Sequence, residues 1–255
     1  MSFAIITVPA APVRRKARHQ AEMVNQLLFG EAVAILKQKN ERWFKVRSLH
    51  DGYEGWLTSH MITIVKDEEA KSSSRFICGD MLTEIEWDGQ TMWIPAGACL
   101  PGFNGEEGIV GELKYKFKGK VIDRLAADSF QVLESSALSK WLNVPYLWGG
   151  RTLMGIDCSG FVQILFRLTG IDLPRDAWQQ AQEGREVKKL SEAQLGDLAF
   201  FDDKDEIVHV GILLSSDKII HAAGKVRIDT IDKKGIIHSE TGKRTHKLKI
   251  IKRAR

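Results

Sequence analysis

Cysteine is scarce in this 255-residue sequence, which contains only Cys78, Cys99 and Cys158. An odd number of cysteines without close spacing argues against a small secreted domain stapled by disulfides. We expect Cys78 and Cys99 to be small buried hydrophobic residues, and a bond between them stays open. The sequence also contains no C-x-x-C or H-E-x-x-H pattern, so it indicates no metal site, and we expect no cofactor.

Long apolar runs and a strong net charge are absent as well. No run is long enough to span a membrane. The formal net charge of +4 is mild and does not indicate nucleic-acid binding, so we expect neither nucleic acid nor membrane as a partner. Residues 243–255 contain seven Lys and Arg residues and no acidic residue. Their alternation with Leu248, Ile250 and Ile251 favours an edge strand over a tail that binds a polyanion.

The N-terminus lacks the mark of a signal peptide. No Lys or Arg precedes the apolar run over residues 3–13, so the positively charged region of a signal is missing. The run leads into Arg14 and Arg15 in the manner of a first strand. We therefore favour a strand over a signal peptide there and expect a cytoplasmic protein.

Short apolar strands separated by Gly, Asn and Asp turns fill residues 1–66 and predict a small β-barrel. The polar segment 66–74 is typical of a linker. Residues 75–125 again consist of short strands with glycine turns, which predicts a second, divergent barrel.

From residue 126 the pattern changes. Helices are expected over 128–142, from Cys158 to a stop at Gly170, and over 176–182. Strands follow at 198–201, 208–214, 218–221, 226–231 and 247–251. Helices first and strands afterwards predict an α+β domain with an antiparallel sheet over 126–255.

Cys158 is the first candidate for chemistry, because Asp157 or a neighbour opens a helix in front of it. The dipole and unpaired N–H groups of a helix N-terminus stabilise an anion, so we expect a lowered pKa for this thiol. The same N–H groups are suited to hold the oxyanion of a tetrahedral intermediate.

Two histidines are the second candidate. A hairpin centred on Ser215 places His209 and His221 directly opposite each other, both directed toward Cys158. A base and the group that orients it need this proximity. The remaining histidines have no partner that the sequence identifies, and we expect them to be surface or structural residues: His19, His50, His60, His238 and His246.

Five motifs in order resemble those of the NlpC-type (NlpC/P60) cell-wall peptidases: Y-x-W-G-G, D-C-S-G-F, G-D-L-x-F-F, H-V-G-I and I-I-H-A-A-G. The resemblance covers about residues 126–255. It implies a papain-like fold, cleavage of bonds to γ-D-glutamyl residues of peptidoglycan stem peptides, and the triad Cys158, His209 and His221. It also implies that Tyr146 and Asp157 lie near the oxyanion site. The W-x-x-V and G-Y-x-G-W patterns of residues 43–56 resemble bacterial SH3-like domains.

Residues 21–31 resemble the first SH3-like domain of γ-D-glutamyl-L-diamino acid endopeptidases, which act on free muropeptides. That resemblance implies a substrate with a free N-terminal L-Ala, whose ammonium is held by Glu22, Tyr53 and Asp176. Arg175, Ser159 and Trp148 complete the implied substrate-binding set. Ala177 departs from the subgroup, which often has Ser there, so one substrate hydrogen bond is in doubt.

Two alternatives remain open from the sequence. One is a non-catalytic cell-wall binding protein beside a decayed catalytic fold. The other is an amidase or acyltransferase that uses the same nucleophile on a different acyl group.

Overall fold

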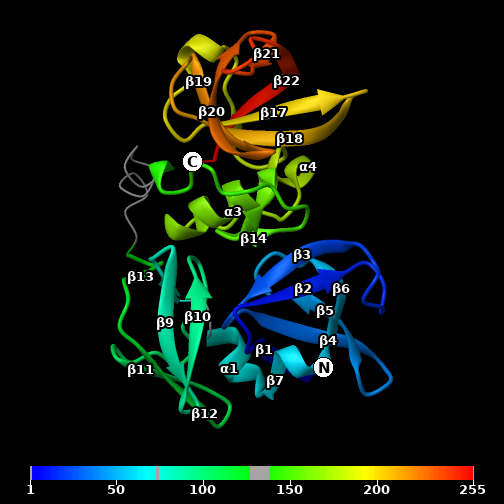
Figure 1. Cartoon of the computed structure of the whole chain (residues 1–255), viewed down its shortest axis with the longest axis vertical. Helices are drawn as coiled ribbons and strands as arrows, with labels where there is room; N and C mark the ends of the chain where they lie inside the picture. Colours follow the sequence, from blue (N-terminus) through cyan, green and yellow to red (C-terminus); the bar gives the residue numbers. More distant parts are fainter. Residues whose placement is uncertain (1, 73–74, 127–137, 255) are drawn as a thin grey trace.

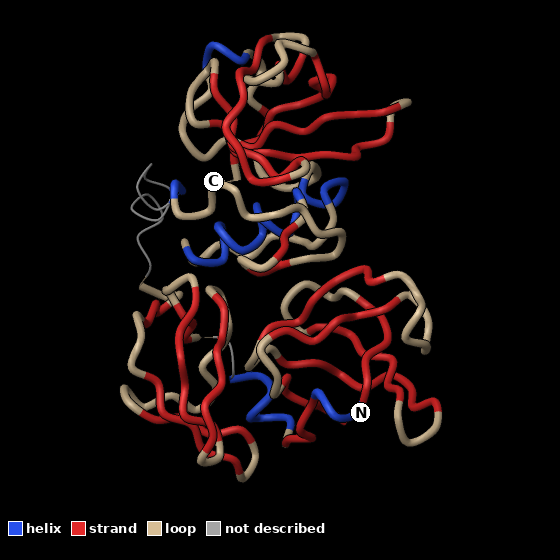
Figure 2. The backbone as a smooth tube through the Cα atoms, viewed as in Figure 1, coloured by secondary structure: helices blue, strands red, loops and turns tan. Residues whose placement is uncertain are grey.

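The computed structural model describes residues 2–72, 75–126 and 138–254. Three parts follow one another along the chain: a first barrel (residues 2–65), a middle module (76–123) and a C-terminal module (138–254). In Figure 1 the C-terminal module lies at the top, with the first barrel and the middle module side by side beneath it. Figure 2 shows several helical segments in the layer between the upper sheet and the two lower modules, and others within the lower part and at the top.

The first barrel is one antiparallel sheet in the order β3-β2-β6-β5-β4-β1-β7. Its strands are β1 (Ser2–Ile6), β2 (Ala10–Arg14), β3 (Met23–Leu28), β4 (Ala32–Lys39), β5 (Trp43–Ser48), β6 (Glu54–Thr58) and β7 (Ile62–Val65), with a 3-10 turn η1 (Ser59–Met61). The run over residues 3–13 is strand, as expected, and it forms two strands, β1 and β2. Pro9 stands between them and has no N–H to continue a ladder.

Both faces of β1 are buried, which joins the barrel to the rest of the molecule. Ala4 and Ile6 face the interior of the barrel. Ile5 points the other way and packs into the main hydrophobic core, which is shared by all three parts.

The segment expected to be a linker contains helix α1 (Asp67–Ser72). Its Ala70 is buried in the main core, and Glu69 accepts a hydrogen bond from the backbone N–H of Gly111 at 2.6 Å. The segment therefore packs between the first two parts of the chain.

The middle module has a sheet in the order β10-β9-β12-β11 and a separate pair β13-β8. Its strands are β8 (Phe76–Cys78), β9 (Leu82–Trp87), β10 (Gln90–Pro95), β11 (Glu107–Val110), β12 (Leu113–Phe117) and β13 (Val121–Asp123). Asp88 and Gly89 both have positive φ, as a tight hairpin turn between β9 and β10 requires. The two other cysteines, Cys78 and Cys99, are buried and form no disulfide bond.

The C-terminal module places helices beside a closed sheet. Its elements are β14 (Arg151–Thr152), β15 (Gly155–Ile156), α3 (Cys158–Leu168), α4 (Ala177–Gln180), β16 (Arg185–Glu186), η3 (Leu190–Glu192), β17 (Leu198–Asp203), β18 (Glu206–Leu213), β19 (Lys218–Ala223), β20 (Lys225–Asp232), β21 (Gly235–Ile237) and β22 (Arg244–Arg253). The sheet order is β16-β22-β17-β18-β19-β20-β21, and β21 pairs back with β22, so six strands close into a barrel. The predicted α+β class with an antiparallel sheet is confirmed.

Strand alternation decides which side chains meet α3. Phe200, Val210 and Ile220 lie in the main core, into which α3 also packs. Phe201 and Ile219 face the interior of the closed sheet. The helix predicted over residues 128–142 falls mostly on residues 127–137, which lie outside the described part of the chain.

Candidate active site

Cys158 is the first residue of α3, as the sequence predicts. Asp157 is the N-cap, and its carboxylate accepts hydrogen bonds from the backbone N–H groups of Gly160 at 2.7 Å and Gly149 at 2.8 Å. The cap therefore ties the start of the helix to the Y-L-W-G-G loop. Cys158 is buried, with 7% of its surface exposed.

The expected lowering of the Cys158 pKa is wrong. Burial raises the pKa of the thiol to about 12, and the charge of Asp157 adds to the rise. The backbone N–H groups of Val210 and Ser159 oppose it but do not outweigh burial. A thiol in this environment stays neutral at pH 7, so its proton has to be removed during attack.

His209 and His221 are in contact on adjacent strands β18 and β19. Nε2 of His209 lies 2.8 Å from Nδ1 of His221, and both side chains are buried. The predicted register is wrong by one residue at the turn. Ile212 pairs with Ile220, which centres the hairpin on Ser216 and brings Gly211 opposite His221. The imidazoles therefore meet as diagonal neighbours, within reach for side chains of this length.

The thiol of Cys158 contacts β18, the strand that carries His209, at the residue after that histidine. The Cys158 thiol lies at the backbone N–H of Val210, which follows His209. Among the described residues no hydrogen bond joins the thiol to an imidazole nitrogen. The expectation that both imidazoles are directed at Cys158 therefore stays a prediction. Such catalytic contacts often tighten only when substrate binds.

The surroundings of His209 include one residue that the sequence did not assign to the site. His246 of β22 stacks on His209, with ring centroids 4.2 Å apart and planes at 23°. Burial, followed by the charges of His221 and His246, lowers the pKa of His209 well below its ordinary value. Burial also lowers the pKa of His246 to about 4. Both rings are therefore neutral at pH 7.

Asp229 of β20 was missed as well. Its Oδ2 lies 3.0 Å from Nε2 of His221, and the side chain is 1% exposed. The strand gives a misleading signal, because Ile228 is partly exposed while Asp229 is buried. The sequence did offer one sign of this role. Asp229 is a charged residue that alternates with Arg227 and Ile231 on the inward face of the strand next to His221.

Arg175 and Ser159 form hydrogen bonds inside the protein, and the substrate-binding roles expected for them stay predictions. Arg175 is buried, and its guanidinium donates to Asp157 at 2.6 and 3.0 Å, to Ser159 Oγ at 2.9 Å and to Asn25 Oδ1 at 2.7 Å. Because these donors are engaged inside the protein, Arg175 holds the helix cap and Ser159 in place and links both to β3 of the first barrel.

Glu22, Trp148, Tyr53 and Asp176 gather at the junction between the first barrel and the C-terminal module. Trp148 Nε1 donates to Glu22 Oε1 at 2.9 Å across the junction. Glu22 also pairs with the exposed Arg15 at 2.8 Å. Tyr53 and Asp176 are half-buried. Burial and the nearby charge of Asp176 raise the pKa of Tyr53 to about 12.

Tyr146 is half-buried and near the nucleophile. Burial raises the pKa of its hydroxyl, and the neighbouring Cys158 and Asp157 raise it further. The phenol therefore stays protonated and can donate a hydrogen bond. This agrees with its expected place near the oxyanion site, which stays a prediction.

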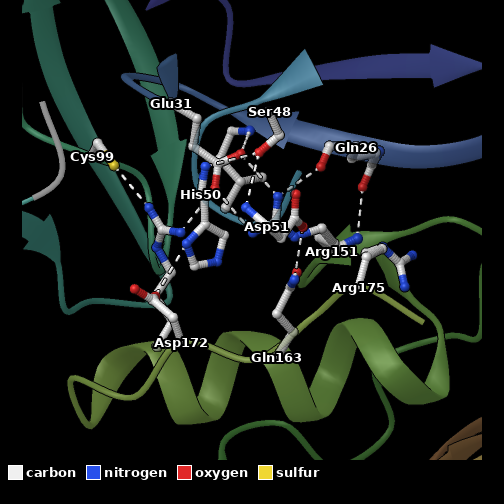
Figure 3. Close-up of polar contacts among 12 residues, drawn as sticks. Gln26, Glu31, Ser48, His50, Asp51, Cys99, Arg151, Gln163, Asp172 and Arg175 are labelled. Carbon is white, nitrogen blue, oxygen red and sulfur yellow. Dashed lines mark hydrogen bonds and ion pairs between the residues drawn. The ribbon is translucent and has the colours of Figure 1, made fainter. Parts of the chain in front are cut away.

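A buried polar cluster, the junction clamp, joins the first barrel to the hairpin that precedes Cys158 (Figure 3). Glu31 accepts from both terminal nitrogens of Arg151 at 2.9 Å and pairs with Arg167 at 3.2 Å. Arg151 also donates to Gln26, and Gln163 of α3 donates to Asp51 of the barrel at 2.9 Å. The clamp thereby positions β14 and α3.

His50 lies beside the clamp and pairs with Asp172 at 3.1 Å, in the structural role expected for it. In the part of the chain that the structure describes, no group of three or more His, Cys, Asp or Glu residues is arranged to hold a metal ion. Nor is any described helix long and apolar enough to cross a membrane.

Comparison with known proteins agrees with this geometry. Residues 143–245 match the model of the NlpC/P60 family, and residues 13–62 match that of the bacterial dipeptidyl-peptidase Sh3 domain. Gamma-D-glutamyl-L-lysine dipeptidyl-peptidase of Bacillus subtilis is 29% identical over 77% of this chain and 71% of its own length. Dipeptidyl-peptidase 6 of Lysinibacillus sphaericus is 25% identical over 90% of this chain and 92% of its own length.

The fold has a solved counterpart over its whole length. The crystal structure of an NlpC/P60 family protein from Bacillus cereus superimposes with a TM-score of 0.81, covers 99% of both chains and is 20% identical. The family models account for the first barrel and the C-terminal module. That the middle module is a second SH3-like barrel stays a prediction for residues 75–125. The chain is a cysteine peptidase with an NlpC/P60 domain behind a bacterial SH3-like domain.

Proposed function

We propose that this peptidase hydrolyses the bond between γ-D-glutamate and the diamino acid in free peptidoglycan stem peptides, and releases L-Ala-γ-D-Glu. Cys158 attacks the γ-carbonyl carbon while its proton passes to His209. The bond to the diamino acid breaks as His209 returns that proton to the leaving amine. Water then hydrolyses the thioester. The backbone N–H of Cys158 at the start of α3 and the Tyr146 hydroxyl are suited to hold the oxyanion.

The observation that carries this proposal is the carboxylate of Asp176, whose hydrogen-bond partners are uncharged: the Trp178 side chain and the first turn of α4. It is half-buried, and within the described ranges no salt bridge includes it. Burial raises the pKa of Asp176, and the nearby charges of Asp157 and Asp51 raise it further. Arg175 lowers that pKa only in part, because its guanidinium is bound to Asp157. A carboxylate in this state favours a bound cation.

The ammonium of a free N-terminal L-Ala supplies that cation. Glu22 brings a second carboxylate from the first barrel, and the Tyr53 hydroxyl near Asp176 offers a further acceptor. A blocked N-terminus has no charge for these groups. The peptidase would therefore act on peptides already freed from glycan, which fits a recycling role in the cytoplasm.

The test compares L-Ala-γ-D-Glu-diaminopimelate with its N-acetylated form. We expect the wild type to prefer the free amine by at least about 10-fold in kcat/KM, since a charge-assisted hydrogen bond contributes about 1.5–3 kcal/mol. Asp176→Asn should lose most of that preference through a higher KM. Glu54→Gln, on an exposed part of the first barrel, serves as the control and should keep that preference. Equal cleavage of both peptides by the wild type would overturn the proposal.

A further inference from the structure

Asp229 ends a chain of buried side chains that begins at His209. His209 Nε2 contacts His221 Nδ1 at 2.8 Å, and His221 Nε2 contacts Asp229 Oδ2 at 3.0 Å. Two further donors fix the carboxylate: Arg227 Nε reaches Oδ2 at 2.8 Å, and the backbone N–H of Ser239 reaches Oδ1 at 2.9 Å. The carboxylate therefore has a defined orientation toward His221.

Two neutral imidazoles in contact do not by themselves decide which one donates. If His209 Nε2 carries the hydrogen, its Nδ1 is free to act as a base. If His221 Nδ1 carries it, His209 must hold its own hydrogen on Nδ1, and the base is lost. Only one of the two arrangements is active.

Asp229 breaks this symmetry. A carboxylate only accepts hydrogen bonds, so His221 Nε2 must carry a hydrogen to donate to it. A neutral His221 then has a lone pair on Nδ1, and His209 Nε2 must donate to that lone pair. We propose that Asp229 is a positioning residue that acts through His221 to hold His209 in the Nε2–H tautomer, which leaves Nδ1 free to accept the proton of Cys158.

The proposal rests on the assignment of Cys158 and His209 as nucleophile and base. The thiol proton moves to His209 Nδ1 as the S–C bond forms, and the resulting imidazolium donates through Nε2 to His221. Asp229 supplies the negative charge at the far end of the chain. The groups that face His209 are His246 from β22, Phe201 from β17 and the charge of Arg227 from β20. Among the described residues, the hydrogen bonds of the His221 ring go to His209 and Asp229.

Asp229→Asn and Asp229→Ala separate this role from a structural one. The asparagine amide can donate to His221 Nε2, which inverts both tautomers and blocks the base. Alanine leaves the tautomers free to exchange. We expect Asp229→Asn to lower kcat by at least 100-fold with KM nearly unchanged, in line with the roughly 10⁴-fold loss known for such a substitution in serine proteases. Asp229→Ala should lose less, and a merely structural role predicts the opposite order because asparagine is the closer match in shape.

Asp232→Asn is the matched control. Asp232 lies on the same strand, is exposed and pairs with Arg244 away from the histidines. Its kcat should equal that of the wild type. Equal activity of wild type and Asp229→Asn, or a larger loss in Asp229→Ala, would overturn the inference.

The tautomer is also measurable without any variant or substrate. In ¹⁵N NMR of the wild-type protein at pH 7, His209 Nδ1 should give the signal of an unprotonated imidazole nitrogen and Nε2 that of a protonated one. The reverse assignment would refute the role of Asp229 even if the peptidase activity stands. Absence of peptide cleavage with the expected tautomer would instead refute the proposed function.

Discussion

Glu31→Gln is the most informative perturbation of the junction clamp. Glu31 is 1% exposed and forms ion pairs with two buried guanidinium groups, those of Arg151 and Arg167. Burial would raise its pKa, but the charges of Arg151 and Arg167 outweigh that effect and lower the pKa to about 2. Relative to the ordinary value of 4.5, the difference corresponds to about 3 kcal/mol.

The sign of the pH effect follows from the lowered pKa. The stabilisation by Glu31 is present above about pH 4.5 and is lost as the pH falls toward about 2. At neutral pH, Glu31→Gln should lower the free energy of unfolding, since removal of one partner from a buried ion pair costs about 3–5 kcal/mol. Urea unfolding followed by tryptophan fluorescence measures this loss, and the difference between variant and wild type should shrink at pH 3.

Glu54→Gln provides the control on the same barrel. Glu54 also pairs with two cations, Lys45 at 2.7 Å and Arg47 at 2.6 Å, but one third of its side chain is exposed. We expect Glu54→Gln to lower the free energy of unfolding by less than about 1 kcal/mol. Equal losses for the two variants would refute the conclusion that burial gives the clamp its strength.

Three further outcomes are expected. Cys158→Ala should abolish turnover with an unchanged circular dichroism spectrum, and activity within about tenfold of wild type would exclude it as the nucleophile. Because the pKa of His209 is lowered well below 6.5 and a base works unprotonated, kcat/KM should persist below that pH; an acid limb at or above 6.5 would contradict the burial argument. Gly149→Ala should cost more stability in urea than Gly52→Ala. Both residues have positive φ, but only at Gly149 would the new Cβ lie 2.8 Å from the backbone oxygen of Met23; equal costs would show that this contact yields freely.

Local features of the sequence predicted local features of the structure. The Asp157 cap and helix α3 follow from neighbouring residues, so the position of Cys158 was foreseeable. The register of β18 and β19 was not, because moving the turn centre from Ser215 to Ser216 changes the pairing by two residues without altering the alternation. The motifs still singled out His209 and His221, the two histidines that the structure brings into contact.

Properties that depend on packing could not be read from the sequence. The helix dipole suggested an acidic thiol at Cys158, but the thiol is buried and lies next to Asp157, which raises its pKa. Arg175 looked like a substrate ligand because of its motif, whereas its partners in the first barrel are distant in sequence. His246 becomes a neighbour of the site only because β22 pairs with β17, far away in sequence, whereas Asp229 lies on the strand that follows His221.

The junction clamp limits how this arrangement of domains can evolve. Arg151 sits at the hairpin before the nucleophile, and Arg175 holds the cap of the nucleophile helix; both find acceptors in the first barrel, Glu31 and Asn25. Deleting the barrel would leave Arg151 without its buried carboxylate partner and would remove one of the acceptors of Arg175. Under the proposed function, substrate specificity and stability both depend on the first barrel, so a broader substrate range is more accessible through point substitutions at Glu22 than through loss of the barrel.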